Sequence, residues 1–161
     1  MRRKDREITD LREIERIIRR CMSIRIAMLD GEYPYIVPMN FGYAFEGEKL
    51  RISMHSAKAG KKIDLLRANP RVAFELCVEK GLEDGKSPCN YGYLYECVMG
   101  RGTIRFVEDP AEKVALLALL ARHQTGRDFA FTELHAGTVE VLVLEVEELS
   151  AKAQKPKPIR V

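Results

Sequence analysis

Short turns join the strand-like segments in the first half of the chain, and this spacing limits how those segments can pair. Residues 23–29 and 35–45 are rich in β-branched, aromatic and apolar side chains, and Asp30-Gly31 between them is a strong hairpin signal. A second short turn at 46–48 leads into another strand-like run, 50–54. Parallel strands need crossover connections of a dozen or more residues, so these segments predict antiparallel pairing.

The second half of the chain continues this pattern and adds helices. Strands are predicted at 71–78, 91–107 and 138–146, with a bulge at Gly100-Arg101-Gly102. Helices are predicted at 10–21 and 63–68, and a third begins at Pro110 and buries residues 114–120. Segments 79–90 and 123–135 are expected to be connections. The pattern predicts a mainly β fold, a six-stranded antiparallel Greek-key β-barrel with flanking helices.

The length and composition fit one domain. A chain of 161 residues can bury about two-thirds of the surface that its unfolded form exposes. Hydrophobic residues make up 46% and charged residues 32%, which excludes wholesale disorder. Basic residues cluster at both ends, where we expect solvated tails. The predicted division is a basic arm at 1–9, a single domain at 10–150 and a tail at 151–161.

Charge and hydropathy narrow the possible partners. The net charge of +3 is too small to indicate a nucleic-acid-binding protein. No apolar run approaches the roughly 20 residues of a membrane helix, and the N-terminus lacks the apolar core of a signal peptide. The four cysteines contain no C-x-x-C pair. We therefore expect a cytoplasmic protein with reduced thiols, no metal site, and no nucleic-acid or membrane partner.

The segment from His55 to Lys62 has the composition of an anion site. It follows the strand 50–54 and leads into the helix 63–68, and it holds Ser56, Ala57, Gly60 and the three lysines Lys58, Lys61 and Lys62. A helix start carries a partial positive charge, so lysines there repel the dipole unless an anion offsets them. Phosphate is a common occupant. The alternative is a solvated basic turn. The spacing matches neither a P-loop nor a Rossmann fingerprint.

A second unusual patch lies at Pro38-Met39-Asn40-Phe41. Proline removes a ladder hydrogen bond, and the Asn40 amide stands between two apolar residues. Backbone and amide groups there could contact the polar edge of a heterocycle. The alternative interpretation is an edge strand with an irregular turn. His55, at the end of its strand, is a candidate catalytic acid, although a ring satisfied by a backbone group is the simpler interpretation.

Several segments together resemble a known family. They are 1–8, Pro34 to Tyr43, the turn 55–57 with Gly60 to Asp64, and Asn69 to Val72. In this order they are similar to the nitroimidazole-resistance branch of the pyridoxamine 5'-phosphate oxidase-related flavoproteins. The resemblance covers most of the chain and is specific in the first half. It implies an FMN-binding split barrel that forms a homodimer.

The resemblance also implies roles for particular residues. The phosphate of the flavin would lie against Ser56, Lys61 and Lys62, while Pro38 to Phe41, Met54 and His55 would border the flavin ring. The partner subunit would contribute Tyr95, Cys97, Val98 and Met99. Cys97 replaces a serine that relatives often carry, and Ala151-Lys152 replaces a Gly-Lys pair, so these two contacts do not carry over. Relatives hold FMN or FAD.

The sequence is consistent with three classes of function. The first is a flavin-dependent reductase of small planar electron-poor acceptors such as nitroimidazoles, with His55 as proton donor and NAD(P)H or another reductant as electron donor. The second is a flavin-storing or flavin-sensing dimer without turnover. By analogy of fold, a pyridoxamine-phosphate-oxidase-like oxidation is an alternative reaction to the reductase. The third, nucleic-acid binding through the basic termini, lacks the interleaved aromatic residues that single strands require.

Overall fold

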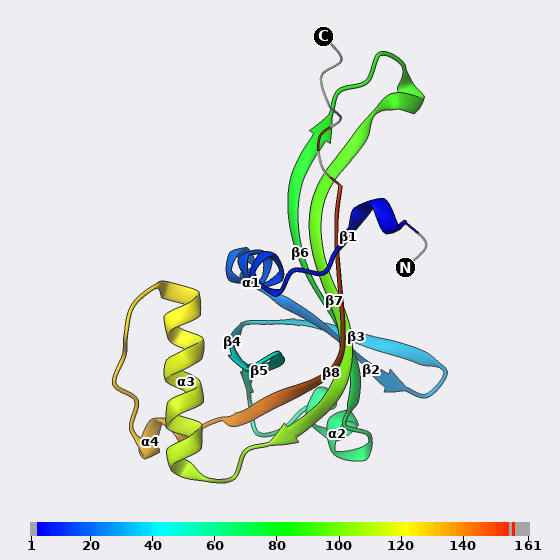
Figure 1. Ribbon diagram of the computed structural model, residues 1–161. Helices are drawn as coiled ribbons and strands as arrows, with labels where there is room; N and C mark the ends of the chain where they lie inside the picture. Colours follow the sequence, from blue (N-terminus) through cyan, green and yellow to red (C-terminus); the bar gives the residue numbers. More distant parts are fainter. Residues whose placement is uncertain (1–2, 155, 157–161) are drawn as a thin grey trace.

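The computed structural model describes residues 3–154 and 156, and it shows a curved antiparallel sheet flanked by helices (Figure 1). All strand pairs are antiparallel, which confirms the mainly β prediction. The strands are β1 (Glu7–Ile8), β2 (Ile24–Asp30), β3 (Tyr33–Met39), β4 (Phe41–Glu46), β5 (Lys49–Ser56), β6 (Arg71–Glu83), β7 (Gly92–Phe106) and β8 (Glu140–Gln154). The helices are α1 (Leu11–Arg20), α2 (Lys61–Ala68), α3 (Pro110–Thr125) and α4 (Glu133–Ala136), with short 3-10 turns at Lys4–Arg6 and Pro88–Asn90.

The strand order explains why the sheet must curl. It runs β3-β2-β6-β7-β8-β5-β4, so β3 and β4 occupy opposite ends of the order. Only Asn40 separates these two strands in the sequence. A single residue can join the two ends only if the sheet bends round into a barrel. The predicted strand 35–45 is therefore two strands, because the chain changes neighbours at Asn40.

Two apolar clusters lie on opposite faces of the sheet. Strand β8 shows the division, since Leu142 and Leu144 belong to the barrel interior while Val141 and Val143 face the cluster beneath α3. This alternation is the period of two expected of a strand buried on both faces. The side chain of the N-cap residue Asp109 accepts a hydrogen bond from the first turn of α3, and the C-cap residue Gly126, with a φ of 70°, follows the last residue of the helix. The predicted connection 123–135 is thus partly helical, because α3 continues to Thr125 and α4 follows.

The predicted turns are confirmed. Gly31, with φ 60°, connects β2 to β3, and Gly47, with φ 63°, connects β4 to β5. The register of β7 against β8 shifts between Arg101 and Gly102, which is the predicted bulge. A Cβ at Gly102 would lie 2.1 Å from the carbonyl oxygen of Glu145, so the two strands approach too closely for a side chain there.

Two predicted boundaries differ from the structure. Residues 79–83, expected in a loop, continue β6, because a register shift after Glu79 and a φ of 92° at Gly81 restore the pairing with β7. The long β6–β7 hairpin therefore projects beyond the barrel in Figure 1. The last strand, expected at 138–146, continues to Gln154 and pairs with β1, and Ala151 and Ala153 are buried. The sheet thus extends into the predicted arm 1–9 and tail 151–161; residues 1–2, 155 and 157–161 lie outside the described residues.

A close approach between α3 and β4 gives a testable stability effect. A Cβ on Gly42 would lie 2.6 Å from the Cα of Leu120, so Gly42→Ala would force the helix backbone to move. We expect a loss of about 1–3 kcal/mol in the free energy of unfolding, as overpacking typically costs, measured by urea denaturation. Gly92→Ala is the matched control, because its Cβ would meet only the flexible end of Glu83. Equal stability of the two variants would contradict this packing.

Candidate functional site

The loop between β5 and α2 presents an uncapped helix start. The N-cap residue of α2 is Gly60, and no side chain among the described residues forms a capping hydrogen bond there. Gly60 has a φ of 131°, which L side chains rarely adopt, and no other described atom lies within 4 Å of the place where a Cβ would stand. The first N–H groups of α2 and the partial positive charge of the helix start therefore provide an approach for an anion.

Ser56, the last residue of β5, supplies a second feature of this site. It is 5% exposed, and its Oγ is buried with no hydrogen-bond partner among the described residues. A buried hydroxyl without a partner costs about 1–3 kcal/mol, so such a group calls for a ligand or a water molecule. Glu140 lies opposite Ser56 on β8, and its carboxylate is 3.9 Å from the guanidinium of Arg67.

The three lysines of the loop have different partners. Lys61 forms an ion pair with Asp30, and its Nζ lies 5.0 Å from the centroid of the Tyr35 ring. The hydrogen bond with Asp30 raises the pKa of Lys61. Lys58 and Lys62 form no hydrogen bond or ion pair with another described residue. Lys61 thus holds α2 to the β2–β3 hairpin, whereas Lys58 and Lys62 are the charges that an anion would meet.

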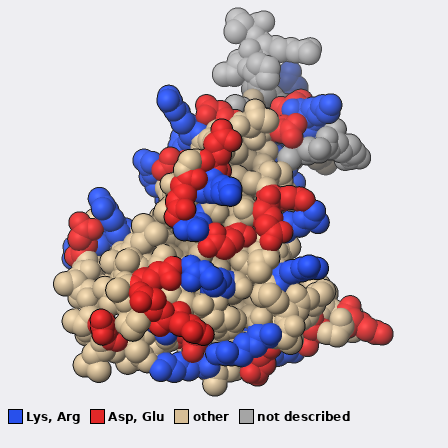
Figure 2. Space-filling model, turned by 60° about the horizontal axis from the view of Figure 1, so that its bottom comes forward, with Lys and Arg blue, Asp and Glu red and all other residues tan. Residues whose placement is uncertain are grey.

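The surrounding surface carries mixed charges. Figure 2 shows acidic and basic side chains interspersed over the face that it draws, without a continuous basic field. Exposed ion pairs also occur in the structure, as between Arg101 and Glu148 and between Arg105 and Glu112. A local anion site at α2 is therefore more consistent with this face than a long basic track for a polyanion.

His55 lies on the opposite face of β5 from Met54 and Ser56. Its side chain is exposed and lines a pocket of about 530 Å3 beneath α3. The pocket is mainly apolar, and its other lining residues are Leu117, Leu120, Phe129, Ala130, Phe131, His135, Thr138 and Val139. His135 Nδ1 accepts the backbone N–H of Thr132 at 3.2 Å, so in the neutral ring the proton lies on Nε2. The pocket thus combines apolar walls with two imidazole groups.

The patch Pro38 to Phe41 forms the junction between β3 and β4. Pro38 and Asn40 are exposed, whereas Met39 and Phe41 are buried, with Phe41 0% exposed. The Asn40 amide donates to Gln124 Oε1 at 2.9 Å, and Gln124 Nε2 donates to the carbonyl oxygen of Phe41 at 2.9 Å. The end of α3 therefore already binds the amide of Asn40 and the carbonyl of Phe41.

The aromatic ring of Phe41 packs in the interior. Its centroid lies 4.5 Å from that of the His123 ring, and His123 Nε2 donates to the carbonyl oxygen of Cys21 at 2.9 Å. Burial lowers the pKa of His123, which favours the neutral ring. Met54 is also buried, at 1% exposed. The side chains of Phe41 and Met54 therefore support the barrel, and their contribution to a ligand site is limited to the backbone.

The structure separates the segment 95–99 from the rest of the predicted site. His55 pairs with Val141 near the start of β8, whereas Met99 pairs with Ser150 near its other end. Nine residues of strand cover a path of roughly 30 Å. Tyr95, Cys97 and Met99 point away from the interior, while Val98 is buried in it. One copy of the chain therefore does not bring 95–99 to His55.

The sequence did not identify the wall of the His55 pocket. Phe129, Phe131 and His135 lie in the segment 123–135, which composition marked only as a polar connection. The available signal was two phenylalanines within an otherwise polar stretch. Glu96 was also missed: it is 4% exposed and binds Arg16, Arg20 and Lys80. Its position between apolar residues of a predicted strand gave no indication of its partners.

These features define a small antiparallel barrel protein with a candidate anion site at a helix start and a histidine-lined pocket beneath a second helix. A family model described as pyridoxamine 5'-phosphate oxidase matches residues 10–153. The chain therefore belongs to the pyridoxamine 5'-phosphate oxidase family, which confirms the resemblance stated from the sequence. No curated protein gives a significant match. No helix within the described residues is long and apolar enough to span a membrane.

Solved structures agree with this assignment. A candidate 5-nitroimidazole antibiotic resistance protein from Bacteroides thetaiotaomicron is 30% identical, with a TM-score of 0.78 over 92% of this chain and 90% of that one. A flavocytochrome from Azotobacter vinelandii is 19% identical, with a TM-score of 0.80 over 100% and 75%. An FAD and heme binding protein from Mycobacterium smegmatis is 17% identical, with a TM-score of 0.79 over 97% and 77%. The last two likenesses concern the fold alone.

Proposed function

We propose that this protein binds a flavin, with FMN as the first candidate and FAD as the alternative, and reduces small planar electron-poor acceptors such as nitroimidazoles. The proposal rests on the buried hydroxyl of Ser56, which has no hydrogen-bond partner among the described residues and lies beside the uncapped start of α2. This arrangement fits a phosphate group, which accepts hydrogen bonds from hydroxyl and N–H donors. The likeness to the candidate 5-nitroimidazole resistance protein supports the acceptor class.

Different residues would contact the phosphate and the rest of the flavin. Ser56 and the first N–H groups of α2 would hold the phosphate, and Lys58 and Lys62 would offset its charge. The backbone of Ala57 and of Pro38 to Phe41 would border the ligand, next to His55. Gly60 keeps the approach to the helix start open because it has no side chain.

A homodimer completes this site. Tyr95, Cys97, Val98 and Met99 lie too far from His55 within one copy, so a second copy would bring this segment to the ligand. The outer face of the β2–β3 hairpin supports an association, because Leu29 is 62% exposed and Ile36 is 59% exposed. Burying such apolar side chains between copies is favourable.

A bound flavin would supply the electrons, and the side chains of the pocket would bind the acceptor and donate protons to it. The apolar walls, including Phe129 and Phe131, suit a planar organic molecule. Reduction of a nitro group also consumes protons, and His55 is placed to donate one into the pocket. His135 Nε2–H is a second donor that could orient an oxygen atom of the acceptor.

The two neighbouring lysines provide a test of the phosphate site. Lys62→Met is expected to weaken FMN binding by about 10- to 100-fold, the loss typical of one charge-assisted hydrogen bond. Lys61→Met should weaken it by less than about threefold, because the Lys61 ammonium is already paired with Asp30. Fluorescence titration of FMN and of FAD measures both. Equal losses in the two variants would show that Lys61 also serves the phosphate.

Turnover is tested with the flavin-loaded protein reduced by dithionite under anaerobic conditions. The reduced protein is mixed with 2-methyl-5-nitroimidazole, with a quinone and with oxygen, and flavin absorbance is followed. Rapid reoxidation by the nitroimidazole supports the proposed reductase. Flavin that stays reduced with both organic acceptors indicates a storage or sensor protein. Pyridoxamine 5'-phosphate, added to the oxidised protein, tests the remaining alternative.

A further inference from the structure

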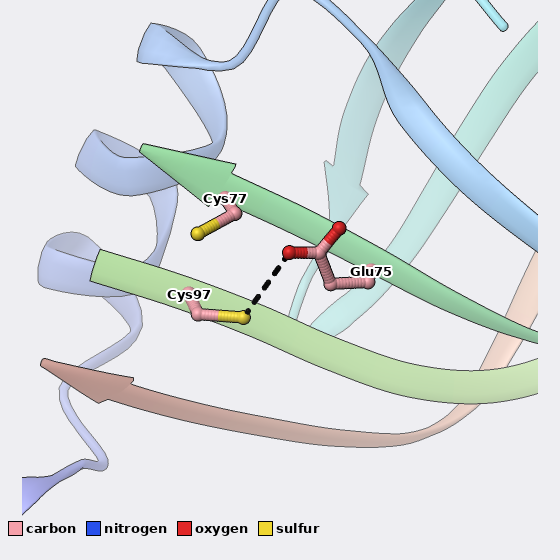
Figure 3. Close-up of side chains that lie close together, drawn as sticks. All are labelled: Glu75, Cys77 and Cys97. Carbon is pink, nitrogen blue, oxygen red and sulfur yellow. Dashed lines mark hydrogen bonds between the residues drawn. The ribbon is translucent and has the colours of Figure 1, made fainter. Parts of the chain in front are cut away.

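Two thiols and a carboxylate lie together on the outer face of the sheet, far from the His55 pocket of the same copy. Cys77 on β6 and Cys97 on β7 are direct cross-strand partners, and Glu75 precedes Cys77 by two residues on the same face of β6. The ligand atoms of all three side chains lie within 4.8 Å of one another (Figure 3). A long hairpin separates the two cysteines in the sequence, so no short ligand motif revealed the cluster.

We propose that Glu75, Cys77 and Cys97 bind a thiophilic divalent metal ion, and that this ion is Zn2+. Two thiolates and a carboxylate are a donor set that zinc accepts, and three protein ligands leave a fourth position for water. Tetrahedral coordination, with bonds of about 2.3 Å to sulfur and 2.1 Å to oxygen, places sulfur and oxygen about 3.6 Å apart and the two sulfurs about 3.8 Å apart. Cys97 Sγ and Glu75 Oε1 are already 3.7 Å apart.

The remaining separations must shorten for all three side chains to bind one ion. All ligand atoms are within 4.8 Å, about 1 Å beyond the spacing that the ion requires. Figure 3 shows the Cys97 sulfur and the Glu75 carboxylate facing each other across the two strands, with the Cys77 sulfur beside them. Backbone pairing of β6 with β7 fixes the distance between the two cysteines, so the site is built on rigid elements.

Neighbouring charges complement the site. Arg25 Nη1 donates to Glu75 Oε2 at 2.9 Å, which holds the carboxylate and leaves Oε1 turned toward the thiols. Ligating carboxylates commonly have such an outer hydrogen bond. Each thiol releases its proton when the ion binds. The charges then balance, because two thiolates and one carboxylate offset the divalent ion and the Arg25 guanidinium.

The test uses the full chain with its thiols reduced, titrated with Zn2+ in competition with a chelator. We expect one ion per chain, and thiolate-to-metal charge-transfer bands when Co2+ replaces Zn2+. Cys77→Ser and Glu75→Gln should each weaken Zn2+ binding by about 100-fold or more, and Arg25→Gln by about 10- to 100-fold. Cys89→Ser is the matched control, because Cys89 is exposed and lies outside the cluster.

Circular dichroism melting of each variant without metal confirms that the variants are folded. Glu75→Gln preserves the volume of the side chain, so its weaker Zn2+ binding would report the lost ligand. Absence of a bound ion in the reduced protein would overturn the proposal. A Zn2+ affinity that falls in Cys89→Ser but not in Cys77→Ser would also overturn the proposal. A chain that binds no Zn2+ but forms a Cys77–Cys97 disulfide with oxidised glutathione would overturn it as well.

Discussion

Replacing Glu96 with alanine is expected to lower the free energy of unfolding by about 3 kcal/mol. The Glu96 side chain is 5% exposed, and its carboxylate forms ion pairs with Arg16 at 2.8 Å, Arg20 at 2.6 Å and Lys80 at 2.7 Å. Removing one partner of a buried charge group typically costs about 3–5 kcal/mol, and the partial exposure of the three cations favours the lower end. The variant would also leave three like charges close together where α1 meets the β6–β7 hairpin.

The pKa of Glu96 gives a similar estimate of its contribution to the free energy of unfolding. Burial alone would raise this pKa, but hydrogen bonds from Arg16 and Lys80 outweigh burial and lower it to about 2. A fall from the ordinary value of 4.5 to about 2 corresponds to about 3 kcal/mol. Because the folded pKa is depressed, this stabilisation is fully present above about pH 4.5 and is lost as the pH falls toward 2.

Urea denaturation at neutral pH measures the effect, together with thermal melting, where a loss of roughly 6–12 °C is expected. Glu148→Ala is the control, because its pair with Arg101 is exposed and should contribute less than about 1 kcal/mol. The difference between wild type and Glu96→Ala should shrink between pH 5 and 2. A difference that stays constant over this range would contradict the ion pairs as its cause.

Much of the fold follows from local patterns that the sequence displays. The hairpin at Gly31, the bulge at Gly102 and the capping of α3 by Asp109 depend on residues close in sequence, so their chemistry could be interpreted directly. The break at Asn40 could not, because residues on both sides of it are strand-like. Only the closure of the sheet, a property of the whole chain, makes the two halves of that segment pair with different neighbours.

The candidate site shows the same division between local and distant features. The candidate anion site at Ser56 and Gly60 depends on local sequence, since a strand end and a helix start lie within a few residues of each other. The partner of Lys61, by contrast, is Asp30, and the packing of Phe41 depends on His123 at the end of α3. Such contacts join distant segments. The sequence therefore indicated which residue types gather near the site, while the tertiary structure decided which of them already have a partner.

Replacing His55 with glutamine is expected to slow reoxidation of the reduced flavin by a nitroimidazole by about 100-fold or more. Proton transfer by a positioned side chain contributes typically 10²- to 10⁴-fold, and glutamine can hydrogen-bond but cannot transfer a proton at neutral pH. His55 is exposed, so the melting temperature and the flavin affinity should stay close to those of wild type. Anaerobic stopped-flow mixing measures the rate, and Lys49→Gln, at the other end of β5, is the control.

The reaction with oxygen separates two explanations for a slow His55→Gln variant. If His55 protonates or orients an organic acceptor in the pocket, reoxidation by oxygen should stay within about threefold of wild type while the nitroimidazole reaction falls. If the substitution instead disturbs the bound flavin, both rates should fall together. An unchanged nitroimidazole rate would show that His55 does not supply the proton, which would then come from solvent or from the Nε2–H of His135 in the same pocket. Repeating the measurement with His135→Gln separates these two sources.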